Sequence, residues 1–205
     1  MQGKHSLSHA QPAIVGLMLA AGRGRRYDPS GRLNKLNERL PDGRSLLRAS
    51  CEALLPWVDE LRVVVGPHNV MVLDRLHDLP YERRVCEQAD KGMSSSLSCG
   101  LSGPVPKLGW LIALGDMPAI ARSTFSQVVE ALKQGARAVR PFQGEQPGHP
   151  VGMSAKLHDD LLQLEGEQGL NTILRLPQIG LTRLEVQDPG CVMDIDLPEQ
   201  LARLR

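Results

Sequence analysis

The sequence predicts an α/β fold, a single domain built on a doubly wound and mostly parallel sheet. Three observations predict it: short apolar runs recur along the chain, segments of helical periodicity separate them, and a glycine-rich loop directly follows the first run. Strands that alternate with helices form βαβ units, whose strands are parallel. A chain of 205 residues is long enough to bury a full core in one such domain.

Six apolar runs have the length of buried strands. They are residues 14–19, 61–65, 83–86, 110–114, 136–140 and 181–186. The expected helices are 45–57, which Pro56 ends, and 94–101 and 123–132, for which serines are candidate N-caps. Pro198 and Glu199 open a terminal helix. Residues 1–12 are polar and expected to be flexible, which leaves 13–205 as the domain.

Composition excludes several classes of function. A formal net charge of +1 and an aromatic content of 3% argue against nucleic acid as a partner.

The run 13–21 is similar to a signal peptide, but cleavage there would remove the first strand. No run reaches the ~18–20 apolar residues that cross a membrane, so we expect a cytoplasmic protein. Four cysteines lack Cys-x-x-Cys spacing and indicate reduced thiols: Cys51, Cys86, Cys99 and Cys191.

The loop after the first expected strand has the chemistry of a phosphate site. Residues 19–26 read Leu-Ala-Ala-Gly-Arg-Gly-Arg-Arg, and a lone lysine follows at Lys35. Such a loop places backbone N–H groups and cations where a phosphate can bind. Tyr27 stands where a dinucleotide fingerprint requires its third glycine, and Asn34 and Leu36 beside the lysine exclude a Walker A loop. The alternative is a solvated cationic turn.

Carboxylates follow other expected strands, at the sheet edge where ligands bind in such folds. Asp116 comes just after 110–114, and Asp194 and Asp196 lie near the C-terminus. Mg²⁺ is usually held by one or two carboxylates, with phosphates and waters as its other ligands. If 194–196 is extended, these two aspartates point to opposite faces, and only one of them faces the crevice. The alternative for Asp116 is a turn or cap residue.

Two further segments carry polar groups that suit ligand binding. Residues 92–97 read Gly-Met-Ser-Ser-Ser-Leu, which places three hydroxyls at a helix start. There they either read the edge of a base or ribose or cap the helix. Residues 148–150 read Gly-His-Pro, and His149 is either a substrate contact or an ordinary loop residue.

These motifs, in this order, closely resemble the MobA-like nucleotidyltransferase family that contains the molybdenum cofactor cytidylyltransferase. The resemblance implies a Rossmann-like domain that binds a nucleoside triphosphate and Mg²⁺. By it, Arg26 and Lys35 contact the phosphates and are catalytic together with Asp116, while Asp116 and Asp196 hold the metal. It also implies binding residues for the nucleotide and the second substrate: Leu19, Ala20, Ala21, Gly22, Gly24, Ser94, Ser95, Ser96, Gly148, His149 and Pro150.

The sequence departs from the family pattern at three places. Lys35 lies several residues further from Arg26 than in most relatives, because residues 28–31 are inserted. Gly24 replaces a frequent serine, and Asn171 stands where the family often has an arginine. The last departure leaves the identity of the second, anionic substrate open.

The resemblance implies transfer of a nucleoside monophosphate, CMP from CTP, to a phosphorylated acceptor of the molybdopterin type, with release of pyrophosphate. An attacking phosphate is already anionic, so this reaction needs no general base. A molybdoenzyme or its maturation factor is the expected protein partner. Two alternatives stay open: transfer to a sugar or alditol phosphate, and a chaperone that binds nucleotide or cofactor without turnover.

Overall fold

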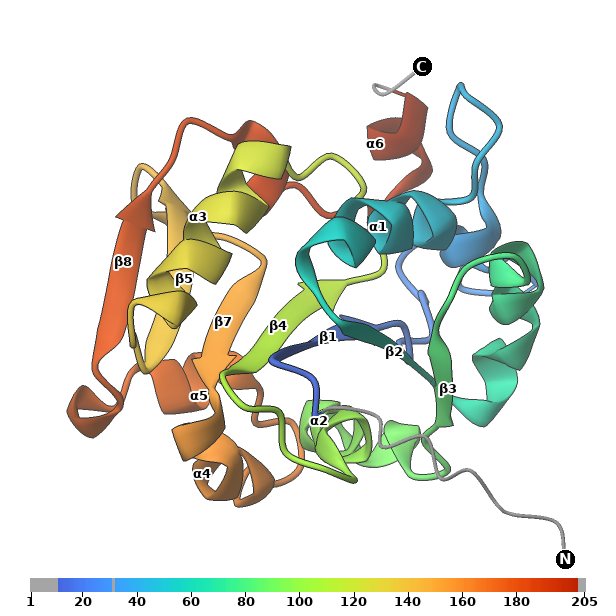
Figure 1. Ribbon diagram of the computed structural model, residues 1–205. Helices are drawn as coiled ribbons and strands as arrows, with labels where there is room; N and C mark the ends of the chain where they lie inside the picture. The colour runs from blue at the N-terminus through green and yellow to red at the C-terminus, as the bar shows by residue number, and fades with distance from the viewer. Residues whose placement is uncertain (1–10, 31, 203–205) are drawn as a thin grey trace, which may run out of the picture.

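The computed structural model describes residues 11–30 and 32–202 of the chain. It shows one eight-stranded sheet with helices on both faces (Figure 1). Most of the N-terminal segment that we expect to be flexible, residues 1–10, lies outside this described part. In the described part, no helix combines the length and the apolar character needed to cross a membrane.

The sheet is mixed and mostly parallel, which confirms the predicted fold class. Its strands lie in the order β3-β2-β1-β4-β7-β5-β6, and β8 pairs with the far side of β5. Pairs β1–β2, β1–β4, β2–β3 and β5–β8 are parallel, whereas β4–β7, β5–β7 and β5–β6 are antiparallel. The bounds are β1 Ile14–Leu19, β2 Glu60–Val65, β3 Glu82–Val85, β4 Gly109–Leu114, β5 Ala138–Gln143, β6 Gln146–Pro147, β7 Val151–Ser154 and β8 Leu181–Glu185.

Strand β7 is the main difference from the predicted sheet. It runs antiparallel between β4 and β5, with Val151 opposite Ile112 and Gly152 opposite Val139. Gly152 lets helix α3 (Arg122–Lys133) approach the strand closely, since a Cβ on Gly152 would lie 2.9 Å from Cγ1 of Val128. A run of four residues that contains a glycine is too short to be recognised as a strand by its periodicity. Its place in the sheet is therefore decided by long-range pairing.

Six α-helices and seven 3-10 helices are present in the described residues. Helices α1 and α3 cover one face of the sheet, and α2, α4 and α5 cover the other (Figure 1). The α-helices are α1 Leu46–Leu54, α2 Met93–Leu101, α3 Arg122–Lys133, α4 His158–Leu162, α5 Leu170–Leu174 and α6 Pro198–Ala202. The 3-10 helices are η1 Lys35–Asn37, η2 Leu55–Trp57, η3 Pro67–Leu76, η4 Ala89–Lys91, η5 Ala155–Leu157, η6 Pro177–Ile179 and η7 Pro189–Val192.

The central strand β1 explains why the core has two layers. Its side chains alternate between the faces of the sheet, as the period of a strand requires. Ile14 and Met18 pack in the cluster that α1 and α3 cover, and Val15 and Leu17 pack in the cluster beneath α2, α4 and α5. All four are almost fully buried, so the continuous apolar run reflects burial on both faces.

The N-termini of α1 and α2 can be compared with the helix starts expected from the sequence. Helix α1 begins one residue after the expected start at 45, with Ser45 as its N-cap, because the Ser45 hydroxyl accepts a hydrogen bond from Arg48 N at 3.2 Å. Helix α2 begins at Met93 with Gly92 as its N-cap, so the prediction of a serine cap is wrong. Gly92 has a φ of 123°, and a Cβ there would lie 2.2 Å from the carbonyl oxygen of Gly166. The close approach of that loop excludes a side chain at the cap position.

Helix α3 is capped by a residue that is distant in the sequence. Its own N-cap position, Ala121, has no side-chain acceptor. The buried carboxylate of Asp188 accepts hydrogen bonds from Ala121 N at 2.9 Å, from the Thr124 hydroxyl at 2.6 Å and from Gly190 N at 3.0 Å. Asp188 thereby fixes the start of α3 to the segment that leads into η7.

We predict that Asp188→Ala lowers the free energy of unfolding by about 2–4 kcal/mol, because it leaves buried donors without an acceptor. Urea unfolding measures the change. The control is Asp74→Ala, which removes the same group from an exposed position of η3 and is expected to change stability by no more than about 0.5 kcal/mol. Equal effects of the two substitutions would contradict the capping role.

Candidate active site

A cavity of about 370 Å³ lies at the carboxyl ends of β1 and β4. We call it the lysine cavity. It is lined by much of the glycine-rich loop and by four other parts of the chain. The lining residues include Leu19, Ala20, Gly22, Gly24, Arg26, Lys35, Met93, Asp116, Asp194 and Asp196. This is the edge at which ligands bind in parallel sheets. The structure therefore brings the predicted phosphate loop, lysine and carboxylates together in one place.

The ammonium of Lys35 lies between two carboxylates. Its Nζ is 2.6 Å from Asp116 Oδ2 and 2.7 Å from Asp196 Oδ1, and a guanidinium nitrogen of Arg26 is 2.6 Å from the other Asp196 oxygen. Burial of the ammonium by itself lowers the pKa of Lys35, but the charges and hydrogen bonds of Asp116 and Asp196 outweigh it and raise the pKa above its ordinary value. Lys35 is therefore a fixed positive charge at neutral pH.

The glycine-rich loop is held in place by two asparagines that sequence reasoning missed. Asn69, buried in η3, donates from Nδ2 to the carbonyl oxygens of Ala20 at 3.0 Å and Gly22 at 2.8 Å. Its Oδ1 accepts a hydrogen bond from Asn34 Nδ2 at 2.8 Å. Asn34 in turn caps η1, the turn that begins with Lys35. One chain of amides thus connects the loop to the lysine, and nothing in the spacing of these residues indicates it.

Two departures from the family pattern have a local explanation. The inserted segment folds on Asp28, whose carboxylate accepts hydrogen bonds from Ser30 N at 2.9 Å and Leu33 N at 2.7 Å. The hydroxyl of Ser30 and these backbone groups lower the pKa of Asp28 to about 2. Gly24 has a φ of 61°, a conformation that serine rarely adopts, and its Cβ position lies 3.5 Å from Lys35 Cγ. The longer connection therefore still delivers Lys35 to the loop.

Asp194 and Asp196 lie at the same cavity, which corrects the expectation that only one of them faces it. Residues 193–196 form no strand, so side chains two positions apart are not forced to opposite faces. Ile195 N donates to the carbonyl oxygen of Asp116 at 3.0 Å, which fixes this segment against the end of β4. Burial and the charges of Asp196 and Asp116 raise the pKa of Asp194. Burial also raises the pKa of Asp196, but Lys35 and Arg26 outweigh it and lower that pKa overall.

The carboxylates fit a divalent ion that is partly coordinated by substrate. Asp116 Oδ1 is buried and, within the described residues, has no hydrogen-bond partner, so this oxygen is available to a cation. No cluster of three or more histidine, cysteine or acidic side chains arranged as a complete metal site is found in residues 11–30 and 32–202. Mg²⁺ characteristically takes one or two carboxylates and completes its octahedron with phosphates and waters. The donor set is that of such a shared site.

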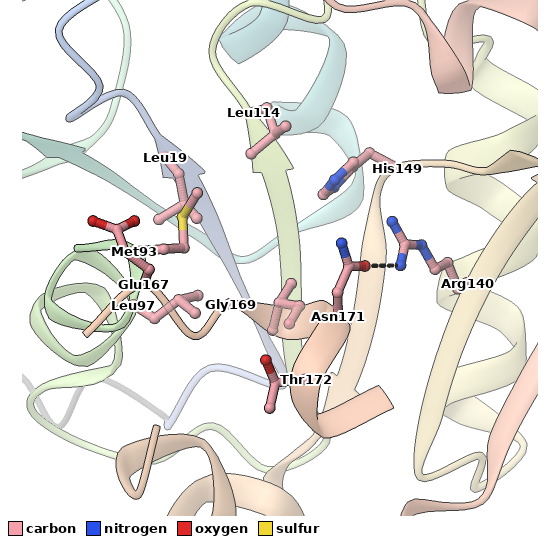
Figure 2. A pocket seen from close by; sticks show the side chains of 11 residues that line it. Leu19, Met93, Leu97, Leu114, Arg140, His149, Glu167, Gly169, Asn171 and Thr172 are labelled. Carbon is pink, nitrogen blue, oxygen red and sulfur yellow. Dashed lines mark hydrogen bonds between the residues drawn. The ribbon is translucent and has the colours of Figure 1, made fainter. Parts of the chain in front are cut away.

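A second cavity of about 350 Å³ adjoins the first, and Leu19, Met93 and Leu114 line both. We call it the arginine cavity. Its polar wall comes from Arg140 on β5, His149 before β7, and Asn171 and Thr172 on α5 (Figure 2). Its other wall is mostly apolar, with Leu97 and Leu170, and also includes Glu167. The arginine cavity contains one residue of the predicted Gly-His-Pro segment, whereas Arg140 and Thr172 were not predicted.

The Gly-His-Pro turn is built into the wall by backbone contacts. His149 N donates to the Cys191 carbonyl oxygen at 2.8 Å, and the His149–Pro150 peptide bond is cis. Gly148 packs so closely on Cys191 that a Cβ would lie 2.6 Å from the Cys191 oxygen. Burial, and then the charge of Arg140, lower the pKa of His149 to about 4. His149 is therefore neutral at pH 7.

The three predicted serines, Ser94, Ser95 and Ser96, do not line the lysine cavity or the arginine cavity. The Ser94 hydroxyl donates to the carbonyl oxygen of Gly166 at 2.8 Å, and Ser94 and Ser95 line a separate hollow beside Cys86. Ser96 is buried. From the same turn, Met93 lines both the lysine cavity and the arginine cavity. A hydroxyl in the first turn of a helix has several directions open to it, and here the packing of the loop at Gly166 selects one of them.

Comparison with known proteins places this geometry in a family. Residues 16–185 match the sequence profile of the MobA-like NTP transferase domain. The chain is 28% identical over 202 residues to nicotine blue oxidoreductase of Paenarthrobacter nicotinovorans, covering 94% of this chain and 97% of that protein. A solved nucleotidyl transferase from Methanothermobacter has a TM-score of 0.80 and 26% identity, with 94% of this chain and 96% of that chain covered.

The fold is also similar to that of Rv0371c from Mycobacterium tuberculosis H37Rv, solved in complex with manganese, with a TM-score of 0.76, 23% identity and 94% and 97% of the two chains covered. The profile match spans most of the chain and includes the glycine-rich loop, Lys35 and Asp116. The chain belongs to the MobA-like NTP transferase domain family, a family of nucleotidyltransferases.

Proposed function

We propose that the protein transfers CMP from CTP to a phosphorylated acceptor of the molybdopterin type. An oxygen of the acceptor phosphate attacks the α-phosphorus of the nucleotide and forms a new phosphoanhydride bond. The bond between the α-phosphorus and the bridging oxygen of pyrophosphate breaks, and pyrophosphate leaves with the electron pair. The observation that carries the proposal is the convergence of Lys35, Asp116 and Asp196 beside the glycine-rich loop.

Charge placement explains how these residues would serve the reaction. Transfer of a phosphoryl-type group depends mainly on alignment and on stabilisation of charge, because the protein takes little covalent part. Lys35 and Arg26 border the lysine cavity and would donate to oxygens of the triphosphate and of the departing pyrophosphate. Gly22 leaves open space at its Cβ position, so that a phosphate can approach the backbone there.

A divalent ion completes the proposal. Asp116 and Asp196 would hold Mg²⁺, and Asp194 is close enough to their charges to take part. When bound, the ion would offset the negative charge of these carboxylates and of the triphosphate. Asp116 contributes a buried oxygen that has no hydrogen-bond partner in the described part of the chain, and it lies directly after β4 at the cavity.

The acceptor would occupy the arginine cavity, next to the triphosphate. The two cavities share a boundary at Leu19 and Leu114, the last residues of β1 and β4. An acceptor phosphate is already ionised and needs no general base. His149 therefore does not have to act as a general base. Its lowered pKa keeps it neutral beside the acceptor. Preference for CTP rests on the family resemblance and on Ala21, which stands where guanylyl-type relatives carry glycine.

The decisive assay measures pyrophosphate release with CTP, GTP, ATP and UTP, with and without isolated molybdenum cofactor. We expect release only with the cofactor present, and a preference for CTP over GTP of about a hundredfold if two buried polar groups are left unpaired by the wrong base. Preferential use of GTP would place the protein in the guanylyl branch. Turnover with an alditol phosphate instead of the cofactor would favour that alternative acceptor, and nucleotide binding without release would favour a chaperone.

A relative similar over nearly its whole length is named as an oxidoreductase, so the same samples should be tested for oxidation of NADH and NADPH. Oxidation of a nicotinamide cofactor without pyrophosphate release would contradict nucleotidyl transfer. The absence of a third glycine at Tyr27 argues against a dinucleotide loop of the usual kind.

We predict that Asp116→Ala lowers kcat/KM by about 10²–10⁴-fold, the scale expected when a preorganised charge-stabilising group is lost. Asp116→Asn keeps the shape of the side chain and should lose nearly as much, because the charge is required. Pyrophosphate release measures both, and Asp74→Ala serves as the exposed control. Normal turnover by a folded Asp116→Ala protein would make Asp116 a turn residue only.

We predict that Lys35→Ala raises KM for the triphosphate at least about tenfold, since a charged donor to the phosphates is lost. It should also lower the free energy of unfolding by about 3 kcal/mol, because Asp116 then loses its counter-charge and Asp196 keeps only that of Arg26. Steady-state kinetics and urea unfolding test the two effects separately, with the exposed Lys133→Ala as control. A destabilised variant with unchanged KM would assign Lys35 a structural role only.

A further inference from the structure

Arg140 is a buried cation in the wall of the arginine cavity. Only 8% of the residue is exposed. Its Nε donates to the Gly148 carbonyl oxygen at 2.9 Å, and one terminal nitrogen donates to Asn171 Oδ1. Within the described ranges 11–30 and 32–202, no carboxylate forms a salt bridge with it. Burial lowers the pKa of the guanidinium below its ordinary value, which reflects this lack of compensation.

A second buried arginine shows that burial alone does not explain Arg140. Arg62, on β2, is 2% exposed, yet its Nε lies 2.6 Å from Glu60 and 3.3 Å from Glu82. Its charge is neutralised inside the protein and its role is structural. Arg140 carries the same charge at similar burial with neutral partners only. A buried charge without a counter-ion is unfavourable, and a ligand anion would supply the missing partner.

The groups around Arg140 are mainly donors. Asn171 uses its carbonyl oxygen to accept from Arg140, so its NH₂ group is left to donate. Thr172 adds a hydroxyl on the same helix, and His149 is neutral. Figure 2 shows the side chains of His149, Asn171 and Arg140 converging on one side of the cavity, across from Met93 and Leu97. The opposite wall is apolar except for Glu167, which lies beside Met93 and away from Arg140 (Figure 2). A positive charge among donors, opposite such a wall, suits an anionic group on a flat ring.

We propose that Arg140 binds the acceptor of the transfer reaction by an anionic group, and that the apolar wall takes a flat heterocycle attached to that group. Asn171 is the positioning residue that fixes the guanidinium. Arg140 then supplies, from β5, the cation that position 171 lacks. The inference rests on the proposed function for the identity of the acceptor, but the anion site itself stands on the contacts of Arg140.

Two pterins that differ in charge provide the probe. 6-Carboxypterin carries an anionic substituent, and 6-hydroxymethylpterin is its neutral counterpart; the fluorescence of both reports binding to the whole chain. We expect the wild-type protein to prefer the carboxylate. Arg140→Gln should lower its affinity at least about tenfold and leave the neutral pterin within about threefold, because only the charged contact is lost.

The substitution Asn171→Asp tests whether Arg140 binds a ligand anion or only stabilises the fold. The new carboxylate would neutralise Arg140 from inside the protein, so we expect 6-carboxypterin binding to fall about tenfold or more while the midpoint of thermal unfolding stays the same or rises. A purely structural role for Arg140 would leave the preference between the two pterins unchanged. The control is Arg183→Gln, which removes an exposed arginine at the paired register position of β8.

The outcomes distinguish this inference from the proposed function. CTP binding, measured by equilibrium dialysis, should be the same in wild type and Arg140→Gln. If CTP does not bind while the Arg140-dependent preference for 6-carboxypterin persists, the proposed reaction fails and the anion site stands. If CTP binds but the wild type shows no preference for the anionic pterin, or binds glycerol phosphate in an Arg140-dependent way instead, the inference is overturned.

Discussion

The ion pairs of Lys35 with Asp116 and Asp196 are the interaction on which the rest of the site depends. They join the connection after β1, the end of β4 and the segment before α6, three parts of the chain that are far apart in sequence. Each carboxylate would repel the other without the ammonium between them. Because the three charges are only partly exposed to water, their attraction is weakly screened and their places are well defined.

Neutral hydrogen bonds hold the frame around these charges. Asn69 accepts from Asn34 and donates to the backbone of the glycine-rich loop, so the loop keeps its shape without a charged side chain. At the start of α3, by contrast, the acceptor of the hydrogen bonds is the buried carboxylate of Asp188. The backbone of the loop is therefore held by amide contacts, and two of its arginines pair with carboxylates elsewhere: Arg23 with Asp90 and Arg26 with Asp196.

Two buried arginines on the same sheet, Arg62 and Arg140, differ in whether a carboxylate neutralises their charge. Arg62 is neutralised by Glu60 and Glu82, near the edge of the sheet at β3. Arg140, toward the opposite edge, has an amide and a carbonyl as its partners and borders a cavity. The turn before β7 contributes to this difference, because it places the Gly148 carbonyl oxygen against Arg140 Nε and His149 in the cavity wall.

The sequence alone determined the parts of the structure that are set by local pattern. The strand β1 and the start of α1 follow from the local pattern of apolar residues, so their expected positions agree closely with the structure. Asp116 is indicated by its place between a strand end and Pro118, and Lys35 by its place as the lone lysine after the glycine- and arginine-rich loop.

Only the tertiary structure decided what depends on contacts between distant segments. The insertion of β7, the joint position of Asp194 and Asp196, and the contact of Arg140 with Asn171 are of this kind. In each case the local sequence permits several conformations of similar energy, and packing against a remote segment selects one of them. The same holds for Ser94, whose hydroxyl is directed to Gly166 by a loop seventy-two positions away. Periodicity carries no information about such partners, because it describes one element at a time.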